Sequence, residues 1–181
     1  MDSIRTVLLI IAALLLSCGP GVQRTTPLHP YMGDLKAREM EKAVHALVNH
    51  ERERQGLSHL RLDHKLSNIA RQHSEDMAGL GFFSHYSPDG MDFSYRYEQS
   101  GYRCAIQQGN TVFQGAENIF TISFSGGRSA ERISEEIVSG WMQSPGHRSN
   151  ILTPHWGRQG IGVALGNDGV FTVIYVTQNF C

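Results

Sequence analysis

The sequence lacks an excess of charge of either sign. Sixteen lysines and arginines stand against seventeen aspartates and glutamates in 181 residues, which gives a formal net charge of −1. A protein that holds nucleic acid needs a basic surface to neutralise phosphates. The charge balance therefore argues against nucleic acid as a partner. The composition, 40% hydrophobic and 18% charged, is typical of one globular domain.

Several catalytic motifs are also absent. The sequence contains no HExxH, GxSxG, P-loop or CxxC pattern. There is consequently no local signature of a zinc protease, an α/β-hydrolase, a nucleotide-binding protein or a thioredoxin.

No apolar run is long enough to span a bilayer. The stretch from Val7 to Leu16 has ten apolar residues behind Arg5, which is the length of a signal-peptide core and about half of a membrane span. The following Leu-Ser-Cys, ending at Cys18, resembles the lipobox of bacterial lipoproteins. The resemblance implies a signal peptide over residues 1–17 and lipidation of Cys18, which becomes the new N-terminus. A plain secreted protein is the alternative.

Residues 18–35 are rich in proline and glycine, and the sequence predicts a flexible tether there, ahead of a domain over residues 36–181. Acyl chains on Cys18 would hold this domain on a bacterial membrane. The residue after the cysteine is Gly19 and not aspartate, which under the sorting rule of enteric bacteria favours the outer membrane or cell surface.

Cysteine is scarce, with three in the chain. Besides Cys18, only Cys104 and Cys181 remain in a chain that is exported to an oxidising compartment. We predict a disulfide between them, which would stabilise the fold by about 4 kcal/mol. Two free thiols are the alternative.

The apolar periodicity predicts helices first and a hairpin last. Helices are expected over residues 39–55, 64–80, 92–100, 129–141 and 144–152. Asp168-Gly169 between the β-rich runs 160–165 and 170–180 indicates a hairpin. This order favours an α+β domain in which helices cover a mainly antiparallel sheet.

Four residues stand where chemistry could occur. His73 lies on the apolar face of the second helix, as a core histidine or as part of a polar cavity. His85 precedes a Pro-Asp-Gly turn, and Glu117 has small and apolar neighbours, so its carboxylate must find a partner. His147 is the third residue of the helix that Ser144 is expected to cap, where the helix dipole keeps an imidazole neutral.

Six linked motifs resemble the bacterial CAP superfamily (cysteine-rich secretory, antigen 5 and pathogenesis-related proteins), also called SCP-like. They are HSEDM at 73–77, FFSHYSPDG at 82–90, GAENI at 115–119, GWMQSPGHRSNIL at 140–152, IGVAL at 161–165 and YVTQNF at 175–180. The resemblance covers about residues 43 to 180. It implies a three-layer α-β-α sandwich with a central cleft.

The resemblance also implies a site that holds zinc or another divalent metal. Its residues match His85, Glu117 and His147, and the position of a second glutamate in animal and plant members is Ser144 here. His73 and Ser144 are expected to support these three. Two histidines and one glutamate are also the residue types of a zinc site with an open position.

We interpret the chain as a membrane-anchored binding module more than as an enzyme, since the family more often binds lipid, sterol or protein than it performs a settled reaction. The ligand would be a divalent metal, a small apolar molecule or a protein. The alternative is a metal-dependent hydrolase that acts on peptides or cell-envelope polymers through His85, His147 and Glu117. A structural envelope protein is a third reading.

Overall fold

The computed structural model describes residues 30–167 and 169–181. Cys18, the expected signal peptide and most of the expected tether lie outside these residues. Along the chain, the elements are α1 (Pro30–Glu53), β1 (Arg61–Leu62), α2 (His64–Leu80), α3 (Phe93–Gln99), β2 (Ile106–Gln108), β3 (Thr111–Phe113), β4 (Ala116–Phe124), α4 (Ala130–Gln143), α5 (Pro145–Leu152), β5 (Arg158–Asn167) and β6 (Thr172–Phe180).

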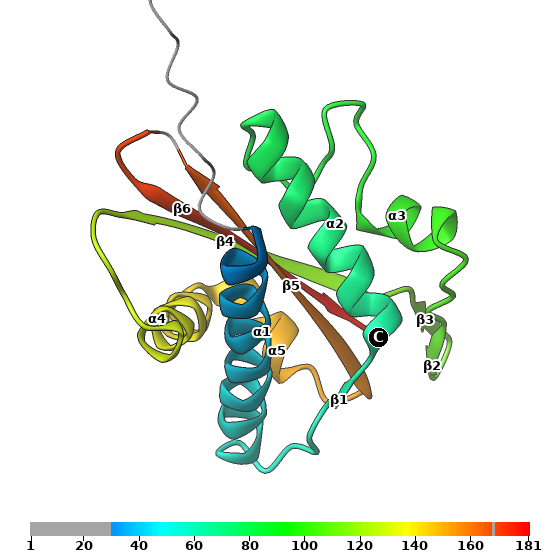
Figure 1. Cartoon of the computed structure of the whole chain (residues 1–181). Helices are drawn as coiled ribbons and strands as arrows, with labels where there is room; N and C mark the ends of the chain where they lie inside the picture. Colours follow the sequence, from blue (N-terminus) through cyan, green and yellow to red (C-terminus); the bar gives the residue numbers. More distant parts are fainter. Residues whose placement is uncertain (1–29, 168) are drawn as a thin grey trace, which may run out of the picture.

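Four strands form one sheet in the order β1-β5-β6-β4. The three long strands pair antiparallel, and the short β1 pairs parallel with β5. Helix α2 covers one face of the sheet, while α1, α4 and α5 lie on the other (Figure 1). The predicted α+β sandwich with a mainly antiparallel central sheet is confirmed.

Helix α1 begins at Pro30, earlier than the expected start at Glu39 and inside the segment assigned to the tether. A proline suits the first turn of a helix because its missing N–H would have no partner there. The side chains of Ala37, Met40, Val44 and Val48 then repeat on one buried face. Because Ala37 is already buried there, the folded part reaches back to the boundary of the tether.

Helix α2 lies very close to the sheet. Its N-terminus is capped by Asp63, whose carboxylate accepts from the N–H groups of Lys65 and Leu66. A side chain at Gly160 or Gly162 of β5 would collide with the α2 backbone, since a Cβ at these positions would lie 2.2 and 2.0 Å from its atoms. These two glycines therefore set the spacing between helix and sheet.

Each face of the sheet has its own apolar core. Among the described residues, seventeen buried ones from α1, α4, α5, the strands and the adjoining loops form the larger one. The smaller one has six, and Cys104 and Cys181 are two of them. These cysteines form the predicted disulfide. The disulfide thus joins the end of β6 to the side of the molecule that has the smaller core.

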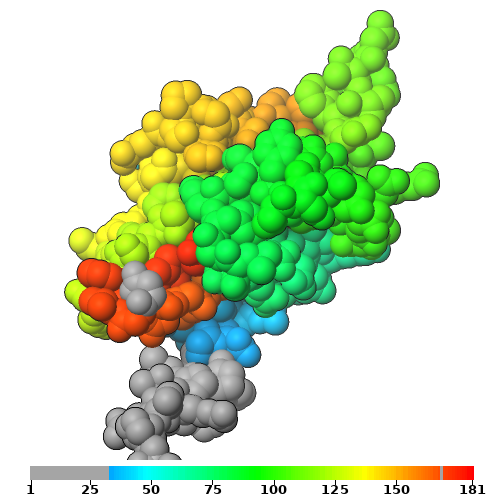
Figure 2. All heavy atoms as spheres, turned by 90° about the horizontal axis from the view of Figure 1, so that it is seen from above, coloured from blue at the N-terminus to red at the C-terminus, as the bar shows by residue number. Residues whose placement is uncertain are grey.

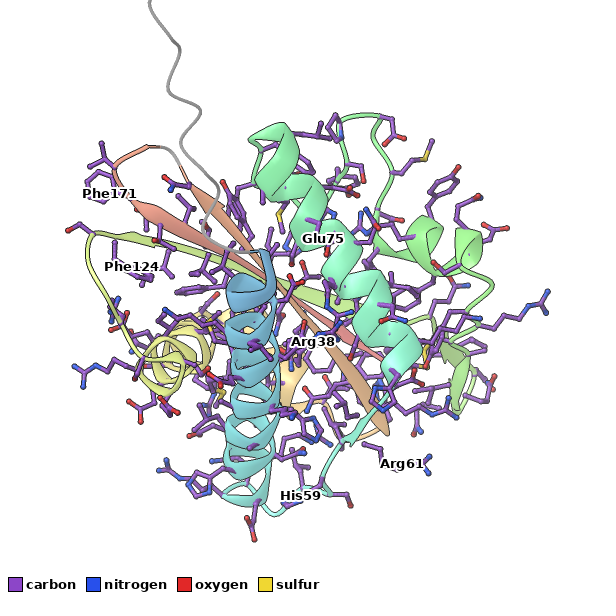
Figure 3. All side chains as sticks on the ribbon, in the orientation of Figure 1. Arg38, His59, Arg61, Glu75, Phe124 and Phe171 are labelled. Carbon is purple, nitrogen blue, oxygen red and sulfur yellow. A yellow bond between two sulfur atoms is a disulfide. The ribbon has the colours of Figure 1, made fainter. Side chains whose placement is uncertain are left out.

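The long strands run from one end of the domain to the other. Phe124 and Phe171 lie at the end where α1 begins, and Arg61 lies at the other end (Figure 3). Seen from above, α2 and the loop after it form the centre of the surface, with the β5–β6 hairpin beside them (Figure 2). Across residues 30–167 and 169–181, no helix combines the length and the apolar character needed to cross a bilayer.

Candidate functional site

The loop after α2 carries His85. Gly81 ends the helix in the left-handed region, at φ 68°. The predicted Pro-Asp-Gly turn follows, in which Gly90 has φ 84° and its N–H donates to the carbonyl of Ser87. The loop returns to α3, whose N-terminus is capped by Asp92. His85 is therefore held on an ordered loop between two capped helices.

Glu117 is the second residue of β4 and pairs across to Asn179 of β6. Cross-strand partners point to the same face of a sheet, and Thr177, two residues before Asn179, bonds to Ser74 of α2. Glu117 therefore faces the α2 side. Its side chain is only 1% exposed, so the carboxylate is costly without partners.

Two side chains supply those partners. Nδ1 of His85 donates to one carboxylate oxygen of Glu117 at 3.0 Å. The guanidinium of Arg96, from α3, donates to the other oxygen at 2.6 Å. The expectation that this carboxylate needs a partner is confirmed, and the partners come from segments 32 and 21 residues away along the chain.

Arg96 also holds the loop. Its guanidinium donates to the carbonyl oxygens of His85 and Met91, both at 3.2 Å, and to the hydroxyl of Ser87 at 3.4 Å. The side chain is 10% exposed. One arginine thus fixes both the backbone that carries His85 and the carboxylate that His85 contacts.

His147 stands on α5, opposite His85. The two ring centroids are 6.5 Å apart. The pKa of His147 is lowered, first by burial and then by the charge of His85. The predicted neutral state agrees with this direction, although its cause is burial and a neighbouring imidazole, whereas the sequence suggested the helix dipole.

Two asparagines join α5 to β4. Asn118 donates to the carbonyl of His147 at 3.2 Å, and Asn150 donates to the carbonyl of Glu117 at 3.2 Å and to the side-chain oxygen of Asn118 at 2.8 Å. These bonds set the position of His147 relative to Glu117. We call His85, Glu117, His147 and Arg96 together the His85 site.

The two expected supporting residues differ in their contacts. His73 is fully buried, and its Nε2 donates to the carbonyl of Ser84, next to His85. Burial lowers the pKa of His73, against the opposing charge of Glu117. Ser144, in contrast, gives no side-chain bond to cap α5, and its backbone hydrogen bonds go to Trp141 and Arg148 and not to the His85 site. Ser144 is the N-cap residue of α5 and Pro145 its first residue, as predicted, but the side chain of Ser144 makes no cap hydrogen bond.

A divalent metal does not fit the site as it is arranged. Within residues 30–167 and 169–181, no three His, Cys, Asp or Glu side chains are grouped closely enough to hold an ion. Glu117 is bound to a cation, Arg96, and Nδ1 of His85 faces the carboxylate. The metal stays a prediction from the family resemblance.

The sequence patterns do not predict that Arg96, Asn118 and Asn150 belong to the site. Asn118 and Asn150 lie within the GAENI and GWMQSPGHRSNIL motifs, but nothing in the spacing shows that they join. Arg96 is one charged residue on a short helix. The only available signal was the need of Glu117 for a partner.

The model of the cysteine-rich secretory protein family matches residues 45–180. The chain belongs to this family. Uncharacterized protein YkwD of Bacillus subtilis (strain 168) is 36% identical over 129 residues, which are 67% of this chain and 41% of that protein. Uncharacterized membrane protein YlbC of the same strain is 29% identical over 140 residues, 77% of this chain and 34% of that protein. The chain thus spans less than half of these relatives.

Two solved structures share the fold. An extracellular protein of Bacillus anthracis str. Ames that contains an SCP domain has a TM-score of 0.61 and 26% identity, over 86% of this chain and 44% of that chain. An outer surface protein from Borrelia burgdorferi has a TM-score of 0.57 and 17% identity, over 80% of this chain and 93% of that chain. The architecture of this chain is therefore that of the cysteine-rich secretory protein family.

Proposed function

We propose that this protein is an exported, lipid-anchored binding module of the cysteine-rich secretory protein family. The anchor is diacylated Cys18, and the domain binds a lipid, sterol or protein ligand at the bacterial outer membrane or cell surface. The extracellular Bacillus anthracis relative and the lipobox-like segment before Cys18 support export and anchoring.

The observation that carries the binding role is the surface around His85. The preceding loop and the end of α2 expose three large side chains, Leu80, Phe83 and Tyr86, at 67%, 48% and 58%. Ser87, on the same loop, helps to line a hollow of about 370 Å³ together with Asp76, Leu80, Pro88 and Asp89. Exposed apolar groups beside polar ones are typical of a surface that binds an apolar ligand or a partner protein.

The metal-dependent hydrolase is less well supported. It requires Glu117 and both histidines as ligands of one ion, yet the carboxylate of Glu117 is engaged by Arg96 and His85. The imidazole of His85 nevertheless has the hydrogen bond that a catalytic base often has, because its Nδ1 donates to Glu117, and its side chain is 43% exposed. A test must therefore separate binding from proton transfer.

The anchor is tested with Cys18→Ser. Metabolic labelling with a tritiated fatty acid and fractionation of membranes compare this variant with the full chain in the bacterium that produces it. We expect label and membrane association for the wild type and loss of both for the variant, because the acyl chains supply the membrane affinity. Unlabelled wild-type protein in the culture medium would favour the plain secreted protein.

The binding role is tested with His85→Asn and His147→Asn, which remove the imidazoles but keep polar groups. A deletion strain is complemented with each variant, and envelope integrity is measured. A module that holds its ligand through the exposed Leu80, Phe83 and Tyr86 keeps its activity within about twofold, whereas loss of a catalytic acid or base costs about 100-fold or more. Loss of activity with normal abundance and an intact circular dichroism spectrum would favour the hydrolase.

A further inference from the structure

The guanidinium of Arg96 is a permanent positive charge next to the carboxylate of Glu117. The guanidinium nitrogen lies 2.6 Å from the carboxylate oxygen, and a guanidinium does not lose its proton in a protein. The side chains of Glu117 and Arg96 are 1% and 10% exposed. Water therefore screens this pair poorly, and each charge is held mainly by the other.

The same geometry opposes a divalent ion on Glu117. Zinc binds carboxylate oxygen at about 2.0–2.2 Å, so an ion on either oxygen would stand next to a guanidinium in a site with little water. Arg96 cannot move aside without losing its contacts to the carbonyls of His85 and Met91. An ion would thus have to displace a cation that three segments hold in place.

The histidines alone form an incomplete donor set. Nδ1 of His85 is bonded to Glu117, which leaves Nε2 for a ligand. The ring of His147 is 6.5 Å away, centroid to centroid. Two imidazole nitrogens are fewer than the three protein ligands that an open zinc site uses.

We propose that Arg96 determines the ligand preference of the His85 site: its guanidinium occupies, on Glu117, the position of a divalent cation, so that the site of this chain discriminates against such ions. The inference rests on the proposed binding function and deepens it, since it concerns which ligands the His85 site accepts beside that exposed surface. It also explains how a chain with the histidines and glutamate of its family can bind without a metal.

The test is a zinc titration by calorimetry of the full chain in detergent, after dialysis against a chelator. Arg96→Met removes the charge and keeps most of the side-chain length. We expect it to bind zinc at least about tenfold more tightly than the wild type, because Oε2 of Glu117 loses its guanidinium partner and a poorly screened cation no longer repels the ion. Arg96→Lys keeps the charge and is expected to stay as weak as the wild type.

Two further variants make the result specific. Arg96→Met combined with Glu117→Gln should lose the gained affinity. Arg103→Met, which removes an arginine that makes no contact with the His85 site among the described residues, should bind zinc as the wild type does. Equal zinc affinity of Arg96→Met and the wild type would overturn the proposal.

If Arg96→Met does not fold by circular dichroism, Arg96→Gln takes its place, because it keeps a hydrogen-bond donor without the charge. Submicromolar zinc binding by the wild type that is lost in Glu117→Gln would also overturn the proposal, whatever the arginine variants do. Neither result depends on lipidation of Cys18, so failure of the anchor and failure of this inference are separate observations.

Discussion

The two faces of the central sheet bury polar side chains in different ways. On the face that α1, α4 and α5 cover, side-chain amides bond to one another in a chain, each donating to the next: the half-buried Asn150, the buried Asn118, Gln178 and Gln159, and finally the ring of His45. On the α2 face, Asn179 is equally buried, yet neither atom of its amide has a partner within the described part of the chain.

The difference concerns the amides, since the side with the larger core also has buried polar atoms without a partner among the described residues, Nη2 of Arg52 and Nε1 of Trp156. A buried polar atom without a partner costs free energy. Asn179 is the cross-strand neighbour of Glu117, and Nε of Arg96 and Nδ1 of His73 are buried without partners as well, among the residues that the structure describes. The α2 face also has the smaller apolar core. Polar groups at the His85 site are therefore held at the expense of stability on that side.

The largest effect is expected from the disulfide, which reinforces the weaker face. Replacing Cys104 and Cys181 together by serine should lower the free energy of unfolding by about 4 kcal/mol, because the unfolded chain regains the freedom of a long loop. Urea unfolding measures the loss. Hydrogen exchange should show α2 and α3 losing protection before α1 and α4, and an equal loss on both faces would contradict the comparison.

A matched pair of substitutions compares the faces directly. Asn118→Leu breaks the amide chain and leaves buried groups unpaired, and we expect it to cost about 2 kcal/mol. Asn179→Leu removes an amide that has no partner to lose among the described residues, so its cost should stay below about 0.5 kcal/mol. Chemical denaturation of both variants measures the two losses in the free energy of unfolding. Equal losses would show that the two amides are in equivalent surroundings.

The smallest expected effect is a loss of folding stability at low pH. Burial and His85 lower the pKa of His147 below its ordinary value of 6.5. Between the lowered pKa and 6.5 the unfolded chain binds more protons than the folded one, so stability is fully present above pH 6.5 and falls as the pH drops below it. His147→Gln should flatten this fall in urea unfolding between about pH 7.5 and 5. An unchanged slope would contradict the lowered pKa.

Local signals in the sequence were sufficient for much of the fold. Asp63, Asp92 and Ser129 cap helices as acidic or hydroxyl side chains do, because a cap depends only on the next three residues. The hairpin is confirmed by the pairing of β5 with β6. The start of α1 was missed, since proline and glycine ahead of Glu39 resemble a linker in composition alone.

The site was only partly predictable. His85, Glu117 and His147 could be named through the family motifs, and the structure brings them together. Arg96 could not be named, because its pairing with Glu117 depends on how α3 folds back over the start of β4. Ser144 stands at the predicted N-cap position of α5, although its side chain makes no cap bond and its backbone N–H donates to the carbonyl of Trp141.

The sequence by itself was sufficient to predict the helices, the hairpin, the disulfide and the family, because each follows from neighbours along the chain, from the expected oxidising compartment or from ordered motifs. Only the tertiary structure decided which charge meets Glu117. Arg96 lies 21 residues before it in sequence, and a buried carboxylate takes whichever cation the packing of loop, helix and strand brings within hydrogen-bond distance.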